Sequence, residues 1–175
     1  YKEKSKKFSE GRNNFLFFFF FYNVRKGLDL LLDVFIELDQ HLWICSYIDK
    51  AFYALYEKEL NNYPNIHLVG HVTPRSKIFF DIINKCNYVI LPSCSEGQPH
   101  SVVEAMGYGL IPIVSSACSI DVGGLGKILE SCCHDEIKQA VIEFASMPAA
   151  VCQTMSRQIR EVIKTDFSIT HFNDN

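Results

Sequence analysis

The sequence lacks the cysteine spacings that bind zinc or build a disulfide framework. Its seven cysteines are an odd number, no two of them stand as C-x-x-C, and no secretory signal precedes them. Several fall in apolar runs, so we expect buried free thiols and a reduced, cytoplasmic protein. No cluster of metal ligands stands out either, so neither a metal nor another cofactor is expected.

The sequence also has little that would suit a membrane span or a nucleic-acid surface. The apolar run 15–22 is eight residues long, too short to cross a bilayer, and suits a buried parallel strand. The net charge is −3, whereas a nucleic-acid surface requires a basic face. Basic residues gather only in the first dozen positions, which favours a solvated tail or linker over contact with anionic lipid headgroups.

What the sequence does have is a regular alternation of β-rich apolar runs and amphipathic segments. Its 175 residues, 48% of them hydrophobic, are enough for one domain with a core. We expect a linker over residues 1–14 and, over 15–175, an α/β domain that ends in an amphipathic helix. Its core would be a doubly wound, Rossmann-like parallel sheet of about six strands with helices on both faces. No G-x-G-x-x-G follows the first strand, which argues against a dehydrogenase.

Turn and cap residues set the expected element boundaries. The predicted strands cover residues 15–22, 42–45, 66–69, 88–91, the run that follows Gly109, and 126–129. Thr73 is expected to cap a helix with Pro74 at its first position. Helices are also predicted near 136–145 and 151–162.

Residues 88–116 form the most informative stretch, a predicted strand, polar loop, short helix and strand in succession. Glu96 stands in the loop, and Glu104 follows in the first turn of a helix expected to open near Ser101. Both carboxylates should face the crevice beyond the carboxyl ends of the strands, where a helix N-terminus favours phosphate. Carboxylates there can accept hydrogen bonds from sugar hydroxyls. The spacing of Ser101 and Glu104 fits a capping box as well, so spacing alone leaves both roles open.

A second segment is predicted to reach the same crevice. In a sheet of order 3-2-1-4-5-6 the order reverses between the first and fourth strands, so the loops after them flank one site. The first loop carries Arg25 and Lys26, and the second carries Glu96. Lys26, with Arg25, can therefore neutralise a diphosphate from one side while N–H groups near Val102 approach from the other. The alternative for Lys26 is a solvated loop lysine.

These motifs resemble the donor-binding signature of the group 1 (family 4) glycosyltransferases, retaining enzymes of the GT-B fold. The resemblance rests on Ser95-Glu96-Gly97, on Glu104-Ala105-Met106 and on the Gly-Leu-Ile-Pro-Ile-Val segment at 109–114. It extends over roughly residues 15–167 and covers only the C-terminal, donor-binding half of that fold. It implies transfer of a sugar from a nucleotide-diphosphate sugar, such as a UDP- or GDP-hexose, to an acceptor hydroxyl with retained anomeric configuration.

The resemblance implies which residues hold the nucleotide part of the donor. Lys26 would contact the diphosphate, with Arg25 beside it. Glu104 would bind the ribose. The loop at His71 and Val72 would meet the base. Family members typically need no metal.

It also implies which residues hold the transferred sugar. Glu96 would lie against that sugar as the catalytic carboxylate, and main-chain groups around Gly97 and Gln98 would face it. A competing interpretation of Glu96 and Glu104 is the carboxylate pair of a glycoside hydrolase, which is weaker because one of the two is better placed for a ribose.

Two residue pairs depart from the family pattern. Where members commonly have a Gly-Arg pair at the end of the first strand, this chain has Phe20 and Phe21. The resemblance then implies that Arg25 substitutes for the missing cation, or that the donor binds less tightly. Where members often have an aromatic-Gly pair, it has Gln98 and Pro99, and proline has no N–H to donate to the sugar.

These departures keep a second function open, namely a nucleotide-sugar-binding module or subunit that has lost catalysis or needs a separate acceptor-binding partner. In either case an N-terminal acceptor-binding domain or subunit is the expected partner, and nucleic acid is not. Membrane contact, at the inner face, would come only through that missing domain. Polysaccharide or glycolipid biosynthesis is the pathway class that the resemblance suggests.

Overall fold

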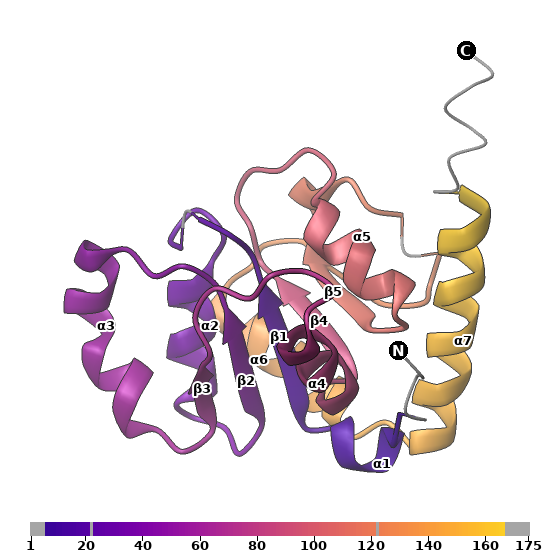
Figure 1. Ribbon diagram of the computed structural model, residues 1–175, viewed down its shortest axis with the longest axis horizontal. Helices are drawn as coiled ribbons and strands as arrows, with labels where there is room; N and C mark the ends of the chain where they lie inside the picture. Colours follow the sequence, from indigo (N-terminus) through magenta and orange to yellow (C-terminus); the bar gives the residue numbers. More distant parts are fainter. Residues whose placement is uncertain (1–5, 22, 122, 167–175) are drawn as a thin grey trace.

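Six parallel strands form one sheet at the centre of the molecule (Figure 1). The computed structural model describes residues 6–21, 23–121 and 123–166. In chain order the strands are β1 (Asn14–Phe18), β2 (His41–Cys45), β3 (Ile66–Leu68), β4 (Tyr88–Leu91), β5 (Ile111–Ser115) and β6 (Lys127–Leu129). Across the sheet they run β3-β2-β1-β4-β5-β6, which confirms the doubly wound arrangement predicted from the sequence.

Helices cover both faces of this sheet. They are α1 (Phe8–Gly11), α2 (Leu28–Phe35), α3 (Lys50–Asn62), α4 (Lys77–Lys85), α5 (His100–Gly107), η1 (Ser116–Cys118), α6 (His134–Ala145) and α7 (Ala149–Asp166). In the view of Figure 1, α4 and α5 lie in front of the sheet and α2 and α6 behind it, while α7 runs beside α5. None of the helices in the described residues combines the length and the apolar character needed to span a bilayer.

Aromatic packing joins the two central strands to a helix behind them. Phe15 of β1 pairs with Tyr88 of β4 in the sheet, and their rings stack with centroids 4.7 Å apart. The Phe35 ring of α2 meets Phe15 edge-on at 5.6 Å. The Tyr88 hydroxyl donates a hydrogen bond of 2.6 Å to the Phe144 carbonyl oxygen of α6, so this buried polar group is satisfied.

The first strand ends earlier than predicted. The run 15–22 was expected to be one buried strand, but β1 stops at Phe18, which pairs with Cys45, the last residue of β2. Beyond this point two backbone hydrogen bonds remain, from the Phe19 N–H to the Cys45 carbonyl oxygen and from the Tyr47 N–H to the Phe20 carbonyl oxygen, and Phe20 and Phe21 are about half exposed. Hydrophobicity alone could not show where the neighbouring strand ends. Tyr22 lies outside the described residues.

The helix cap predicted at Thr73 is wrong. The α4 helix begins at Lys77, and Ser76 is its cap, with a hydroxyl that accepts a hydrogen bond from the Phe79 N–H. Residues before Ser76 cannot continue the helix because Arg75 has a left-handed backbone, with φ of 62°.

The N-terminal segment and the cysteines differ in detail from what the sequence suggests. Of residues 1–14, expected as a linker, the structure describes 6–14, and there Phe8–Gly11 form the short helix α1, whose first carbonyl accepts a hydrogen bond from the Asn87 side chain. The cysteines are free, as predicted, but the prediction that they are buried holds only for Cys45, Cys86, Cys118 and Cys152.

Candidate functional site

The loops that follow β1 and β4 meet at the carboxyl edge of the sheet, where the strand order reverses. Gly27, with φ of 77°, lies so close to the second loop that a Cβ atom on it would stand 2.4 Å from the Pro92 carbonyl oxygen. The Arg25 carbonyl oxygen accepts a hydrogen bond of 3.0 Å from the Cys94 N–H. These contacts fix two segments, some seventy residues apart in the chain, against each other.

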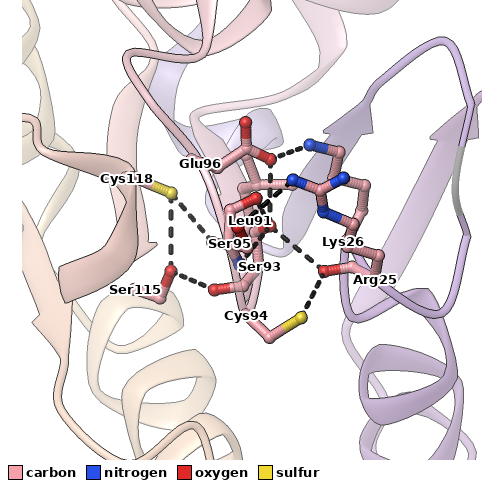
Figure 2. A network of polar contacts seen from close by, with 9 residues as sticks. All are labelled: Arg25, Lys26, Leu91, Ser93, Cys94, Ser95, Glu96, Ser115 and Cys118. Atoms are coloured by element: carbon pink, nitrogen blue, oxygen red, sulfur yellow. Dashed lines mark hydrogen bonds and ion pairs between the residues drawn. The ribbon is translucent and has the colours of Figure 1, made fainter.

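An ion pair joins the two loops at their centre (Figure 2). The Lys26 ammonium group contacts the Glu96 carboxylate, and the two side chains are only 6% and 8% exposed. The Lys26 nitrogen also lies 4.0 Å from the centroid of the Phe19 ring. Lys26 is thus a buried partner of Glu96 and not a solvated loop lysine, and the predicted meeting of these two residues is confirmed.

Ser93 is a site residue that the sequence analysis missed. Its hydroxyl lies 2.9 Å from a Glu96 carboxylate oxygen and 3.1 Å from the Arg25 carbonyl oxygen. A serine in a polar loop gives no sequence signal for such a role. Beneath it, the Ser115 hydroxyl of β5 donates a hydrogen bond of 2.6 Å to the Ser93 carbonyl oxygen, so the loop that carries Glu96 is anchored to the sheet (Figure 2).

Arg25 extends over the same loop. Its guanidinium donates a hydrogen bond of 3.2 Å to the Ser95 hydroxyl, next to Glu96 (Figure 2). Gly97 and Gln98 follow at the exposed part of this loop, and a Cβ atom on Gly97 would meet no atom within 4 Å. The main chain at Gly97 is therefore open to a ligand on that side.

The first turn of α5 excludes one of the two roles that the spacing left open for Glu104. The cap of α5 is Pro99, no side chain accepts a capping hydrogen bond there, and the buried Ser101 hydroxyl has no partner among the described residues. The capping box is therefore wrong. Instead, a Glu104 carboxylate oxygen lies 3.5 Å from Nε of Arg75, a residue that the sequence analysis did not select. Arg75 could have been suspected, because its loop follows β3 and so ends at the same edge of the sheet.

The loop between β3 and α4 places the two residues expected near a base differently. The His71 ring is exposed and meets the Phe20 ring edge-on at 4.5 Å. The Val72 side chain is buried in the core, so its side chain does not face the crevice. The Phe20 and Phe21 rings, shortly after the end of β1, meet edge-on with centroids 4.3 Å apart.

Each of the two carboxylates at this edge of the sheet lies beside a cation: Glu96 beside Lys26, and Glu104 beside Arg75. Carboxylates accept hydrogen bonds from hydroxyl groups, and ammonium and guanidinium groups bind phosphate. Within the described residues no group of three or more histidine, cysteine or acidic side chains could hold a metal ion. The site is thus suited to a ligand that carries both hydroxyl and phosphate groups.

Comparison with known proteins gives the family. Residues 12–160 match the family described as Glycosyl transferases group 1. An uncharacterized glycosyltransferase of Methanocaldococcus jannaschii is 29% identical over 129 residues, which are 70% of this chain and 33% of that protein. The chain therefore spans about a third of the length of this curated relative.

Solved structures share the fold. HepE of Anabaena, in complex with UDP and glucose, superimposes with a TM-score of 0.75 at 14% identity over 95% of this chain and 47% of HepE. The C-terminal domain of the group 1 glycosyl transferase LpcC from Francisella tularensis gives 0.68 at 12% identity over 91% of this chain and 88% of that domain. The α/β sheet is thus the Rossmann-like domain of GT-B glycosyltransferases, and the chain belongs to the group 1 glycosyl transferases.

Proposed function

We propose that this chain is the donor-binding half of a retaining glycosyltransferase, which takes a sugar from a nucleotide-diphosphate sugar. The observation that carries the proposal is the contact between Lys26 and Glu96, two residues of different loops that meet at the switch point of the sheet. An acceptor-binding domain or subunit would supply the other substrate.

The ion pair can serve both ends of such a donor. A lysine ammonium has three protons, so Lys26 can donate one hydrogen bond to Glu96 and another to a diphosphate oxygen. Arg25, above the same loop, adds positive charge. Glu104 would accept hydrogen bonds from the ribose hydroxyls, and the exposed ring of His71 would border the base.

The same geometry suits the charges that develop during transfer. When the bond between the anomeric carbon and the diphosphate breaks, negative charge grows on the diphosphate and positive charge on the sugar. Lys26 and the N-terminus of α5 would stabilise the diphosphate. Glu96 would stabilise or position the sugar, while main-chain groups at Gly97 and Gln98 hold its other side. None of these steps requires a metal ion.

The relatives favour a uridine nucleotide as the first donor to test, because HepE was solved with UDP and glucose. Calorimetric titrations of the chain with UDP, GDP and their glucose esters, with and without magnesium, test the proposal. We expect one nucleotide to bind without magnesium and its affinity to fall at least about tenfold in Lys26→Met and Glu104→Gln. Matched changes on the exposed surface of α3, Lys58→Met and Glu57→Gln, should leave binding unchanged. Absence of binding by every nucleotide would refute the proposal.

A second candidate is a nucleotide-sugar-binding module without catalysis. It is favoured by Phe20 and Phe21 after the end of β1 and by Pro99, which cannot donate an N–H to the sugar. Glu96→Gln separates the two functions once the acceptor-binding half is supplied. Loss of turnover with retained nucleotide binding would support catalysis by this half, and the anomeric configuration of the product, read by NMR, would test retention.

A further inference from the structure

The loop between β3 and α4 reaches from the residues that follow β1 to helix α5. Its first end is fixed by a hydrogen bond of 3.0 Å from the Val69 N–H to the Ile44 carbonyl oxygen of β2. Its last residue, Ser76, caps α4. Between these ends Val72 is buried, which anchors the middle of the loop in the core. The loop is thus held in place at three points.

This loop contacts a residue on each side of the crevice. On the side of β1, His71 meets Phe20. On the side of α5, Arg75 lies 3.5 Å from Glu104. The loop therefore brings the Arg75 guanidinium to Glu104, the carboxylate whose role the sequence spacing left open.

Arg75 has an unusual backbone for its residue type. Its φ of 62° is left-handed, a conformation that residues other than glycine rarely adopt and that raises the free energy of the folded state. The contact with Glu104 does not explain it, because the Arg75 side chain is 77% exposed and exposed ion pairs stabilise proteins little. Strained backbone of this kind is often kept at ligand sites.

The arrangement of charges around Glu96 and Glu104 suggests a role for Arg75. The two carboxylates, Glu96 and Glu104, would repel a nucleotide diphosphate unless cations stand beside them. Lys26 is buried against Glu96. Arg75 stands beside Glu104 through Nε, and its guanidinium has four further N–H groups on the two terminal nitrogens.

We propose that Arg75 is a donor-binding residue whose guanidinium binds the phosphate attached to the ribose. This inference rests on the proposed function, in which Glu104 holds that ribose. Each carboxylate then has its own cation, and each cation faces the phosphate nearest to the sugar that the carboxylate binds. Lys26 serves the phosphate next to the transferred sugar, and Arg75 serves the one next to the ribose.

Ligands with no, one or two phosphates distinguish the role of Arg75 from that of Lys26. The probes are uridine, UMP and UDP, or the guanosine series if GDP is the nucleotide that binds. We expect Arg75→Gln to lower the affinity for UMP and UDP at least about tenfold and to leave the affinity for the nucleoside unchanged. Lys26→Met should lower the affinity for UDP and leave the affinity for UMP within about twofold of the wild-type value. Lys77→Gln, which removes a charge from the exposed first residue of α4, is the matched control and should change none of them.

A glycine variant adds a readout that a structural ion pair would not give. Arg75→Gly relieves the left-handed backbone, so its midpoint of thermal unfolding should rise although it binds UMP as weakly as Arg75→Gln. If Arg75→Gln binds UMP within twofold of the wild type, this inference is wrong while the proposed function stands. If the wild type binds no nucleotide, both are wrong.

Discussion

Lys26 and Glu96 form a buried ion pair across two loops that the chain separates by seventy residues. In the proposed function one residue of the pair binds the diphosphate and the other the transferred sugar. In that function the ion pair would already hold the groups that bind the two ends of the scissile bond before a donor arrives. Such preorganisation lowers the cost of binding and of charge development.

Breaking this pair from one side should destabilise the fold. Lys26→Met leaves the buried Glu96 carboxylate beside the Ser93 hydroxyl but without its ammonium partner, and we expect the free energy of unfolding to fall by about 3 kcal/mol. Urea unfolding of Lys26→Met, Glu96→Gln and the double variant measures the coupling. The double variant should lose less unfolding free energy than the two single variants lose together. Losses that simply add would mean that Lys26 and Glu96 do not interact.

Gly27 should tolerate no side chain, because the loop after β4 lies against it. In Gly27→Ala the new Cβ atom would stand 2.4 Å from the Pro92 carbonyl oxygen, so the loops must separate and nucleotide binding should be lost. Gly124 is the matched control, since it has almost the same φ, 76°, but a Cβ atom there meets nothing within 4 Å.

Both alanine variants incur the left-handed strain, and only Gly27→Ala adds the steric clash. Chemical unfolding should show a loss of about 1 kcal/mol for Gly124→Ala and clearly more for Gly27→Ala. Equal losses in the two variants would mean that the loops can move apart freely.

Glu104 should matter for ligand binding and little for stability. Because α5 has no capping box, Glu104→Gln removes no hydrogen bond from the helix start, and the free energy of unfolding should change by less than about 0.5 kcal/mol. Nucleotide binding should weaken in the same variant. A loss of about 1 kcal/mol or more in urea unfolding would instead assign Glu104 a structural role.

Lys6 makes the stability of the chain depend on pH. Burial lowers the pKa of its ammonium group from 10.5 to about 7, and its nitrogen has no hydrogen-bond partner among the described residues. Between these two values the unfolded chain binds the proton and the folded chain does not, so the free energy of unfolding increases with pH. Below about pH 7, where the folded chain also binds the proton, the full cost of burying the charge is present.

Lys6→Met removes this cost. We expect the variant to be more stable than the wild type by at least about 1 kcal/mol at pH 6, and the difference to shrink as the pH approaches 10. Lys7→Met, at a neighbouring lysine that is 71% exposed, is the control. Thermal unfolding across this pH range measures the difference. If Lys6→Met were no more stable than the wild type at low pH, burial of the Lys6 charge would not cost stability.

The sheet and the crevice could be predicted from the sequence because they depend on local patterns and one topological rule. Apolar runs that alternate with amphipathic segments give the order of the elements, and the doubly wound order then brings the loops with Lys26 and Glu96 together. That step required no knowledge of side-chain geometry.

What the sequence could not predict depends on contacts between distant segments. The end of β1 at Phe18 is set by where β2 ends, and the start of α4 is set by the left-handed backbone of Arg75. The same backbone brings Arg75 to Glu104. The spacing of Ser101 and Glu104 fits a capping box, and only the structure shows that α5 begins without one.

NMR can locate bound nucleotide on the domain directly. Uniformly ¹⁵N-labelled chain would be titrated with UDP and with GDP, and the backbone amide shifts followed. The proposed function predicts that the largest changes fall in three segments, 25–27, 70–76 and 93–104, which meet at the carboxyl edge of the sheet. Changes concentrated elsewhere, or no saturable change with either nucleotide, would contradict it.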